Sequence, residues 1–249
     1  MSTSPLLMGH DSSAALRRFQ PLRYSGYHPP VVVPGLILAG GRSTRMGRPK
    51  ALLPLDARDT FVSRLVRTLR DGGVRDVVVV VAADGPVDAI RSALAGAPRT
   101  PRLALNPDPS RGQLSSLLAG LQAVDHPGVD AVLVTLVDIP LVGASTVRAL
   151  LEAYARTRAP IVRPSRRVDA AHGHPVIFDR SVFDDLRGAD PDAGAKPVVR
   201  ARATEIEDVP VDDRGAFLDI DTPADYRRVF GRPVPVDLPS RVDRTRAVP

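Results

Sequence analysis

Two continuous apolar segments constrain the fold of this chain more than any other feature of its sequence. One is a run of five valines at 77–81, and the other spans 131–137. A strand with apolar residues on both of its faces has to be covered on both sides, as in parallel sheets that lie between layers of helices. Segments with the apolar spacing of an amphipathic helix separate these runs from their neighbours, as at 61–69. The chain is therefore expected to contain a parallel α/β sheet.

Strands and helices are predicted to alternate along most of the chain. We expect early strands at 35–39, 77–81, 103–105 and 131–137, and early helices at 61–69, 86–96, 115–124 and 145–157. This order is typical of a mostly parallel sheet with helices on both faces, a three-layer α/β/α arrangement. In the less regular later part we expect short strands at 160–162, 175–178, 204–209 and 217–220, and helices at 180–187, 193–201 and 223–230. The prediction is one domain at 31–230 between mobile tails at 1–30 and 231–249.

Composition excludes several classes of protein. The 249 residues include no cysteine, which excludes thiol catalysis, disulfides, zinc ribbons and cysteine-ligated iron–sulfur clusters. No apolar run approaches the roughly 20 residues that cross a bilayer, and no secretory apolar core follows the N-terminus, so we expect a cytoplasmic protein without membrane contact. The net charge is +6, but each predicted tail contributes +2 and only 4% of residues are aromatic. A nucleic-acid partner is not expected from this pattern.

The loop after the first predicted strand, 38–50, carries the strongest functional signal. It combines three glycines in the spacing G-G-x5-G with four cations, Arg42, Arg45, Arg48 and Lys50, and contains no acidic residue. Glycines let the backbone approach a ligand closely, and cations favour a polyphosphate. The spacing matches neither G-x-G-x-x-G nor the P-loop pattern. A plain turn is the alternative interpretation.

Two further positions are chemically informative. Lys50 and Lys196 are the only lysines among 34 basic residues, which suggests sites that need a compact point charge, unless they survive by chance. Asp138 lies at the tip of the fourth predicted strand, before Pro140. Facing the polyphosphate loop, it is suited to bind Mg²⁺, although a turn or helix-capping aspartate would look the same.

These motifs, in order, resemble those of the MobA/MocA-like nucleotidyltransferases. The residues 38–50 are similar to the family's signature loop, and Asn106-Pro107 with 112–117 is similar to its N-P…G-M-x-x-S-L segment. Further likenesses are Asp138-Ile139-Pro140 to G-D-Q-P, 173–178 to G-H-P-V-L-F, 192–195 to D-x-G-A and 218–223 to L-D-I-D-T-P. The resemblance covers about residues 35–230 and implies a glycosyltransferase-A-like, Rossmann-like fold.

The resemblance also implies a role for each matching position. Lys50 and Arg45 would be catalytic, and Asp138 and Asp221 would hold Mg²⁺. The nucleotide would be bound by Leu38, Ala39, Gly40, Gly41, Arg42, Asn106, Gly112 and Ser115. Ser115 is also a candidate helix N-cap. The acceptor would be bound by Gly173, His174 and Lys196, although His174 would also suit a simple turn before Pro175.

The implied reaction is transfer of a nucleotide from a nucleoside triphosphate to a phosphorylated acceptor, with release of pyrophosphate. The acceptor would be molybdopterin, with cytidylyl transfer from CTP placed first and guanylyl transfer from GTP second. The first motif reads Ala39-Gly40-Gly41, as in guanylyl transfer, whereas the later motifs look more like the cytidylyl branch. Two residues depart from that branch, which usually has glycine at the position of Val137 and glutamine at the position of Ile139. Transient contact with a molybdoenzyme or its chaperone is implied as well.

Other functions stay open at this point. The acceptor could be another small phosphorylated or carboxylated metabolite, or the chain could bind nucleotide as a catalytically silent regulator. An NAD(P)-dependent oxidoreductase is disfavoured by the glycine spacing and by the absence of an acidic residue directly after Val81. His172 and His174 have metal-ligand spacing but lack a third ligand. A basic loop at 163–167 could meet an anionic acceptor or simply face solvent.

Overall fold

The structure of the protein is a computed structural model that describes residues 31–97 and 99–235. The predicted tail at 1–30, and the part of the 231–249 tail beyond residue 235, lie outside the described residues. Seven strands form one sheet: β1 (Gly35–Leu38), β2 (Val77–Ala82), β3 (Arg102–Asn106), β4 (Ala131–Leu136), β5 (Ile161–Arg166), β6 (Val176–Asp179) and β7 (Ile206–Val211). The helices are α1 (Phe61–Asp71), α2 (Val87–Leu94), α3 (Gly112–Val124), α4 (Ala144–Thr157), α5 (Phe183–Arg187), α6 (Lys196–Ala201) and α7 (Pro223–Phe230).

The strands lie in the order β3-β2-β1-β4-β6-β5-β7. All neighbouring pairs are parallel except those of β6, which runs antiparallel to both β4 and β5. The order reverses at β1, because β2 follows it on one side and β4 lies on the other. In open α/β sheets, the crevice at such a reversal, outside the carboxyl ends of the strands, is where ligands bind. The topology therefore directs attention to the loops after β1 and β4.

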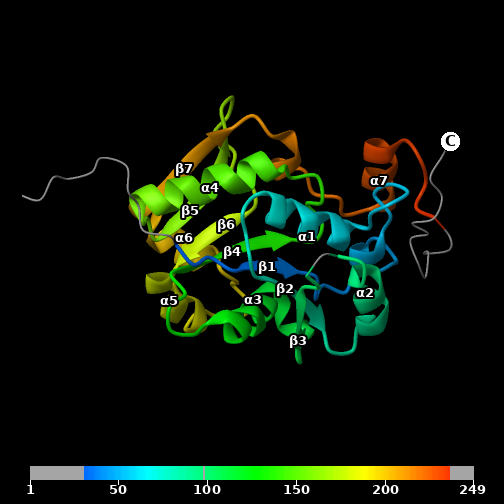
Figure 1. Ribbon diagram of the computed structural model, residues 1–249, viewed down its shortest axis with the longest axis horizontal. Coiled ribbons are helices and arrows are strands. Elements are labelled where there is room, and N and C mark those ends of the chain that lie inside the picture. The colour runs from blue at the N-terminus through cyan, green and yellow to red at the C-terminus, as the bar shows by residue number, and fades with distance from the viewer. Residues whose placement is uncertain (1–30, 98, 236–249) are drawn as a thin grey trace, which may run out of the picture.

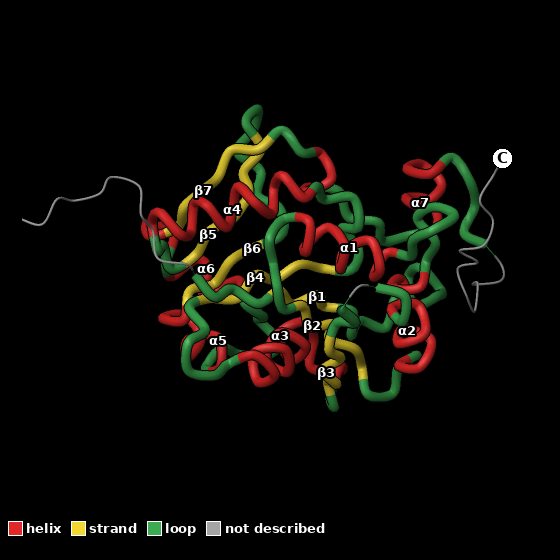
Figure 2. The backbone as a smooth tube through the Cα atoms, in the orientation of Figure 1, coloured by secondary structure: helices red, strands yellow, loops and turns green. Residues whose placement is uncertain are grey.

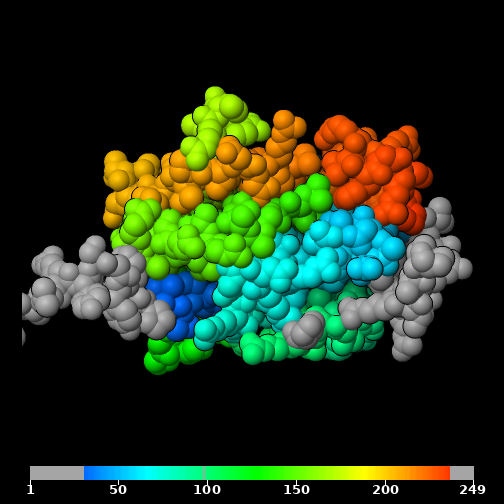
Figure 3. All heavy atoms as spheres, turned by 45° about the horizontal axis from the view of Figure 1, so that its top comes forward, coloured from blue at the N-terminus to red at the C-terminus, as the bar shows by residue number. Residues whose placement is uncertain are grey.

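Helices cover both faces of the sheet, as Figures 1 and 2 show. Alternate valines of β2 belong to two separate cores: Val79 lies in the core that includes residues of α1, α4 and α7, whereas Val80 lies in the core that includes residues of α3 and α5. This confirms the prediction of strands buried on both sides. Viewed from the α4 side, α4 and α1 form a continuous layer with α7 next to it, and the segment between β5 and β6 projects from the edge (Figure 3). No helix in the described ranges is long and apolar enough to span a membrane.

One predicted strand is wrong. The segment 217–220 was expected to be a strand, but Arg214–Phe217 folds as a 3-10 helix, which Asp213 caps by accepting a hydrogen bond from the Gly215 N–H. Ile220 then donates its backbone N–H to the carbonyl of Asp138, 2.9 Å away, and not to a neighbouring strand. The apolar residues of this segment are buried in a connection between elements. In the sequence, such a buried connection has the same apolar pattern as a short strand.

Candidate active site

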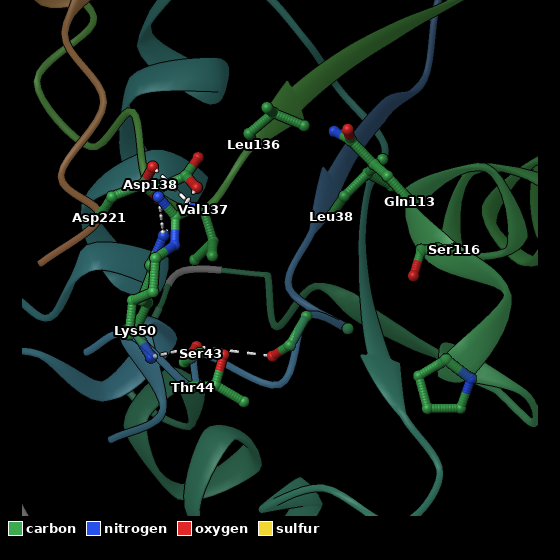
Figure 4. A pocket seen from close by; sticks show the side chains of 15 residues that line it. Leu38, Ser43, Thr44, Lys50, Gln113, Ser116, Leu136, Val137, Asp138 and Asp221 are labelled. Carbon is green, nitrogen blue, oxygen red and sulfur yellow. Dashed lines mark hydrogen bonds and ion pairs between the residues drawn. The ribbon is translucent and has the colours of Figure 1, made fainter. Parts of the chain in front are cut away.

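A cavity of about 300 Å³ lies at the carboxyl ends of β1 and β4 (Figure 4). The loop after β1 forms one wall, the start of α3 forms a second, and the segments after β4 and before α7 form the third. The lining residues are Leu38, Gly40, Gly41, Ser43, Thr44, Arg45, Lys50, Pro109, Gly112, Gln113, Ser116, Leu136, Val137, Asp138 and Asp221. The cavity thus lies where the strand order predicts a ligand site, and the glycine-rich loop lines it.

The glycine-rich loop is fixed to the rest of the fold at both ends. Ala39 donates its N–H to the Val80 carbonyl (2.8 Å), and Met46 is inserted in the core with 3% of its surface exposed. Gly40 lies so close to α3 that an added Cβ would be 2.6 Å from the Ser116 hydroxyl oxygen, whereas a Cβ on Gly41 would meet nothing within 4 Å. Gly41 is therefore the position where backbone is open to a ligand, and Gly40 is the position where the loop packs against α3.

Lys50 joins the two predicted metal ligands. Its side chain is only 10% exposed, and its ammonium donates hydrogen bonds to Asp138 Oδ2 (2.9 Å) and to Asp221 Oδ1. Burial opposes the charged form, but the hydrogen bonds to Asp221 and Asp138 outweigh it and raise the pKa of Lys50. Arg45 pairs with the other oxygen of Asp221 at 2.9 Å. The hydrogen bond from Lys50, followed by the charges of Lys50 and Arg45, lowers the pKa of Asp221, which keeps it ionised.

Both aspartates are held by backbone contacts near them. The Ile220 N–H to the Asp138 carbonyl links the two acidic segments directly. Asp221 immediately precedes Thr222, the N-cap of α7. A capping box fixes the start of this helix: Thr222 Oγ1 accepts from the Asp225 N–H (3.1 Å), and Asp225 Oδ2 accepts from the Thr222 N–H (2.9 Å). The carboxylates are therefore preorganised on rigid backbone and do not sit on a free loop.

The carboxylates also fit a divalent cation. Asp138 Oδ1 is buried and has no hydrogen-bond partner, although buried carboxylate oxygens are normally paired. Mg²⁺ in proteins is typically held by one or two carboxylates, with phosphate and water completing the shell. Asp138 and Asp221 supply that number, and within the described ranges no cluster of three or more His, Asp or Glu side chains arranged for a metal is found. Asp219 lies close by, and burial followed by the charges of Asp138 and Asp221 raises its pKa.

Asn106 acts behind the cavity and does not line it. Its side chain is nearly fully buried and donates from Nδ2 to the hydroxyls of Ser115 (2.8 Å) and Ser116 (3.0 Å). Its Oδ1 accepts from the Asp108 N–H at 3.0 Å. Asn106 therefore orients Ser116, which lines the cavity and touches the Gly40 position. The predicted N-cap role of Ser115 is wrong, because α3 begins at Gly112 and Ser115 lies inside its first turn.

A second cavity, of about 590 Å³, adjoins the first. Its floor is apolar, with Leu114, Leu117, Val134, Val176 and Phe178, and basic groups lie among its other lining residues: Arg163, His172, His174, Lys196 and Arg200. All three predicted acceptor residues, Gly173, His174 and Lys196, line this cavity. Their position is consistent with binding a molecule that has an apolar body and an anionic group.

The two histidines of this cavity have protein partners. Arg163 lies 2.9 Å from His172 Nε2 and pairs with Asp208 at 2.6 Å, while His172 Nδ1 lies 3.4 Å from the same aspartate. Burial lowers the pKa of His174, so its imidazole is neutral at pH 7. Gly173 passes so close to the Ala216 carbonyl that a Cβ would lie 2.2 Å from it. This glycine is required by packing against the connection that leads to Asp221.

Most of the predicted nucleotide-side residues gather in the first cavity, but not all of them. Those that line it are Leu38, Gly40, Gly41, Arg45, Lys50, Gly112, Asp138 and Asp221; Ala39, Arg42, Asn106 and Ser115 do not. Ser43, Thr44 and Gln113 also line this cavity, although no motif in the sequence marks them as lining residues. Ser43 and Thr44 lie inside the recognised loop, so their proximity could have been anticipated from it. Nothing in the sequence indicates the direction of the Gln113 side chain.

A comparison with protein families decides the relationship. The family model "MobA-like NTP transferase domain" matches residues 35–207. The chain belongs to the MobA-like NTP transferase family. This confirms the resemblance stated from the motifs, and with it the expectation of a nucleotidyltransferase-type fold and of a transferase.

Individual relatives carry different names. The chain is 33% identical to a nicotine blue oxidoreductase of Paenarthrobacter nicotinovorans over 76% of its own length and 92% of the relative. It is 30% identical to a probable molybdenum cofactor guanylyltransferase of Rhodopirellula baltica, over 70% and 87% of the two chains. Among solved structures, it is similar to Rv0371c of Mycobacterium tuberculosis, with 30% identity, a TM-score of 0.69, and coverage of 81% and 98%. Rv0371c has also been solved in complex with manganese.

Proposed function

We propose that this chain transfers guanylate from GTP to the phosphate of a molybdopterin-type acceptor and releases pyrophosphate. The observation that carries the proposal is Lys50, buried between Asp138 and Asp221 at the end of the glycine-rich loop. A cationic group and two carboxylates beside an open backbone loop suit a nucleoside triphosphate with its metal. The neighbouring cavity, with an apolar floor and basic groups, suits the acceptor.

GTP is proposed in preference to CTP, although the motifs taken together favour CTP. Relatives named molybdenum cofactor guanylyltransferase support this choice. The local packing supports it too, because the alanine that the cytidylyl branch has at position 40 would place its Cβ 2.6 Å from the Ser116 hydroxyl. The first motif is therefore matched to its surroundings in this chain and is a better guide to the base than the later motifs.

In the proposed reaction, an acceptor phosphate oxygen attacks the α-phosphorus of GTP in line with the bond to the β-phosphate. The new oxygen–phosphorus bond forms as the α–β bond breaks, and pyrophosphate leaves with its electron pair. The nucleophile is already ionised, so no general base is required. Lys50 and Arg45 would neutralise the phosphate charge and keep the triphosphate in place. Asp138 and Asp221 would hold Mg²⁺, which when bound neutralises additional charge on the transferred group.

The acceptor end of the reaction is assigned to the second cavity. Lys196 and His174 would contact the acceptor there, with Gly173 shaping the wall. Neutral His174 would offer hydrogen bonds and no charge, so the anionic part of the acceptor would be held by Lys196 and Arg200. A metabolite of similar shape with one phosphate is the alternative acceptor.

A second candidate, reduction by a nicotinamide dinucleotide, is favoured by the likeness to nicotine blue oxidoreductase. One experiment separates the candidates. The purified chain is mixed with molybdopterin, Mg²⁺ and either GTP, CTP or ATP, and pyrophosphate is measured. In parallel, NADPH and NADH are tested for oxidation with nicotine blue supplied as the substrate to be reduced. Pyrophosphate release with GTP and no oxidation of either dinucleotide supports the proposal. Dinucleotide oxidation without pyrophosphate release overturns it, and tight GTP binding without release identifies a silent nucleotide-binding protein.

A further inference from the structure

The two cavities of the site share part of their walls. Four residues line both of them: Leu38, Gly112, Gln113 and Leu136. Three of the four are apolar or lack a side chain. Gln113 is therefore the one residue in the described ranges that presents a polar side chain to both cavities.

The position of Gln113 on α3 directs its side chain into this junction. The next residue, Leu114, is buried in the core with 1% exposure, and Ser116 is held by Asn106, so the first turn of the helix has a fixed orientation. Gln113 itself is exposed. Figure 4 shows it extending from α3 toward Leu136, across the cavity from Lys50 and the two aspartates. In the described part of the chain its carboxamide makes no hydrogen bond, so both of its polar atoms are available.

The reaction places its chemistry at this junction. If the first cavity holds GTP and the second holds the acceptor, the α-phosphate and the attacking oxygen meet where the cavities join. A carboxamide has two N–H donors and a carbonyl acceptor, so it can hydrogen-bond to both reactants at once.

We propose that Gln113 is a further catalytic residue, whose Nε2 donates a hydrogen bond to the α-phosphate while the carboxamide aligns the attacking acceptor phosphate. This inference rests on the proposed function. A neutral donor at the transferred group stabilises the negative charge that develops there in the transition state, and it adds no full charge that would tighten binding of the ground-state nucleotide. The effect of the residue should therefore appear in turnover more than in GTP affinity.

The test compares Gln113→Leu and Gln113→Met with Gln122→Leu. Gln122 is an exposed glutamine on the same helix that lines neither cavity, so it is a matched control. With GTP, Mg²⁺ and molybdopterin, both Gln113 variants should lose about 10- to 100-fold in kcat, at or below the loss typical of one oxyanion-type donor. Their Kd for GTP without acceptor should stay within about threefold of wild type, and Gln122→Leu should match wild type in both measurements. Unchanged kcat, or a loss confined to GTP affinity, overturns the proposal.

A binding readout separates this proposal from the proposed function. The side-chain amide NMR signal of Gln113, assigned by its absence in Gln113→Leu, should shift on adding GTP alone and on adding molybdopterin alone, while that of Gln122 should not. Absence of turnover in the wild-type protein would contradict the proposed function. The amide signal would still show whether Gln113 contacts the two ligands. A Gln113 amide that responds to neither ligand overturns the Gln113 proposal, whatever the turnover.

Discussion

Replacing Lys50 with methionine should both weaken the fold and remove activity. Methionine keeps the length of the side chain but removes the ammonium that bridges Asp138 and Asp221. The variant leaves two carboxylates facing each other without their cation, and Asp219 adds a third acidic group nearby. This substitution therefore tests whether the charge of Lys50 holds the two carboxylates together.

The expected loss of stability follows from the burial of the three groups. Removing one partner of a fully buried ion pair costs about 3–5 kcal/mol, but these carboxylates keep some solvent, so about 2–3 kcal/mol is expected at pH 7. For a domain of this size, that is a fall of about 4–12 °C in Tm. Turnover should fall about 10²-fold or more, as for other single charge-stabilising groups.

The same substitution should change how stability depends on pH and on metal. In the wild type, the lowered pKa of Asp221 means that its contribution is present above the unfolded pKa and is lost as the pH falls through the lower folded pKa. In Lys50→Met, Asp221 loses the hydrogen bond and the charge that lower its pKa, so it should take up a proton at higher pH than in wild type. The stability deficit relative to wild type should therefore shrink as the pH falls toward the ordinary range of carboxyl groups. Added Mg²⁺ or Mn²⁺ should raise the Tm of the variant more than that of wild type.

Thermal unfolding across pH, with and without metal, measures all of these effects. Lys196→Met is the matched control, because Lys196 is the other lysine and its side chain is exposed; its Tm should equal that of wild type. A Lys50→Met protein with unchanged Tm, with no extra response to metal and with wild-type turnover would refute the electrostatic account of the site.

Three other changes test separate parts of the structure. Gly40→Ala should lower stability by about 1–3 kcal/mol by overpacking against Ser116, measured by denaturant unfolding, whereas Gly41→Ala should leave stability unchanged; equal effects would contradict the described packing. Asn106→Leu should lower the free energy of unfolding by about 1–3 kcal/mol for each buried polar partner left unpaired. An unchanged Tm would show that the hydrogen bonds of Asn106 do not contribute to stability. Mg²⁺ with GTP at about 100 times its Kd should add about 2.7 kcal/mol of stability. Chelation with EDTA should remove most of this gain, because without the metal the carboxylates of Asp138 and Asp221 would face the negative triphosphate directly. Full stabilisation by GTP without metal would exclude the proposed metal role.

The sheet was predictable because its signals are local. The valines of β2 and the run in β4 are apolar on both faces, which only a covered strand explains, and both strands lie where they were expected. The segment 217–220 was mispredicted because its apolar residues are buried by a connection that pairs with the Asp138 carbonyl and not with a strand. Apolar periodicity reports burial, but it does not report which hydrogen-bond partners a buried segment finds.

The site was predictable as a set of loops and less so as a set of contacts. The glycine-rich loop, Lys50, Asp138 and Asp221 converge as the motifs implied, although Lys50 and Asp221 are far apart in the chain. Asn106, in contrast, does not line the cavity and hydrogen-bonds to Ser116, because a side chain on a strand end can point behind a cavity as easily as into it. The position of Gln113 was not anticipated, since the place where two cavities meet is a property of the assembled fold alone.

The central claim is tested most directly by following the α-phosphate of GTP itself. GTP labelled at the α-phosphate is incubated with the wild-type protein, Mg²⁺ and molybdopterin, and the products are separated. The account predicts that the label moves into a molybdopterin–guanine dinucleotide in step with pyrophosphate release, and that Lys50→Met is slower by about 10²-fold or more. Label that stays in GTP under these conditions, with the protein folded and the nucleotide bound, would contradict it.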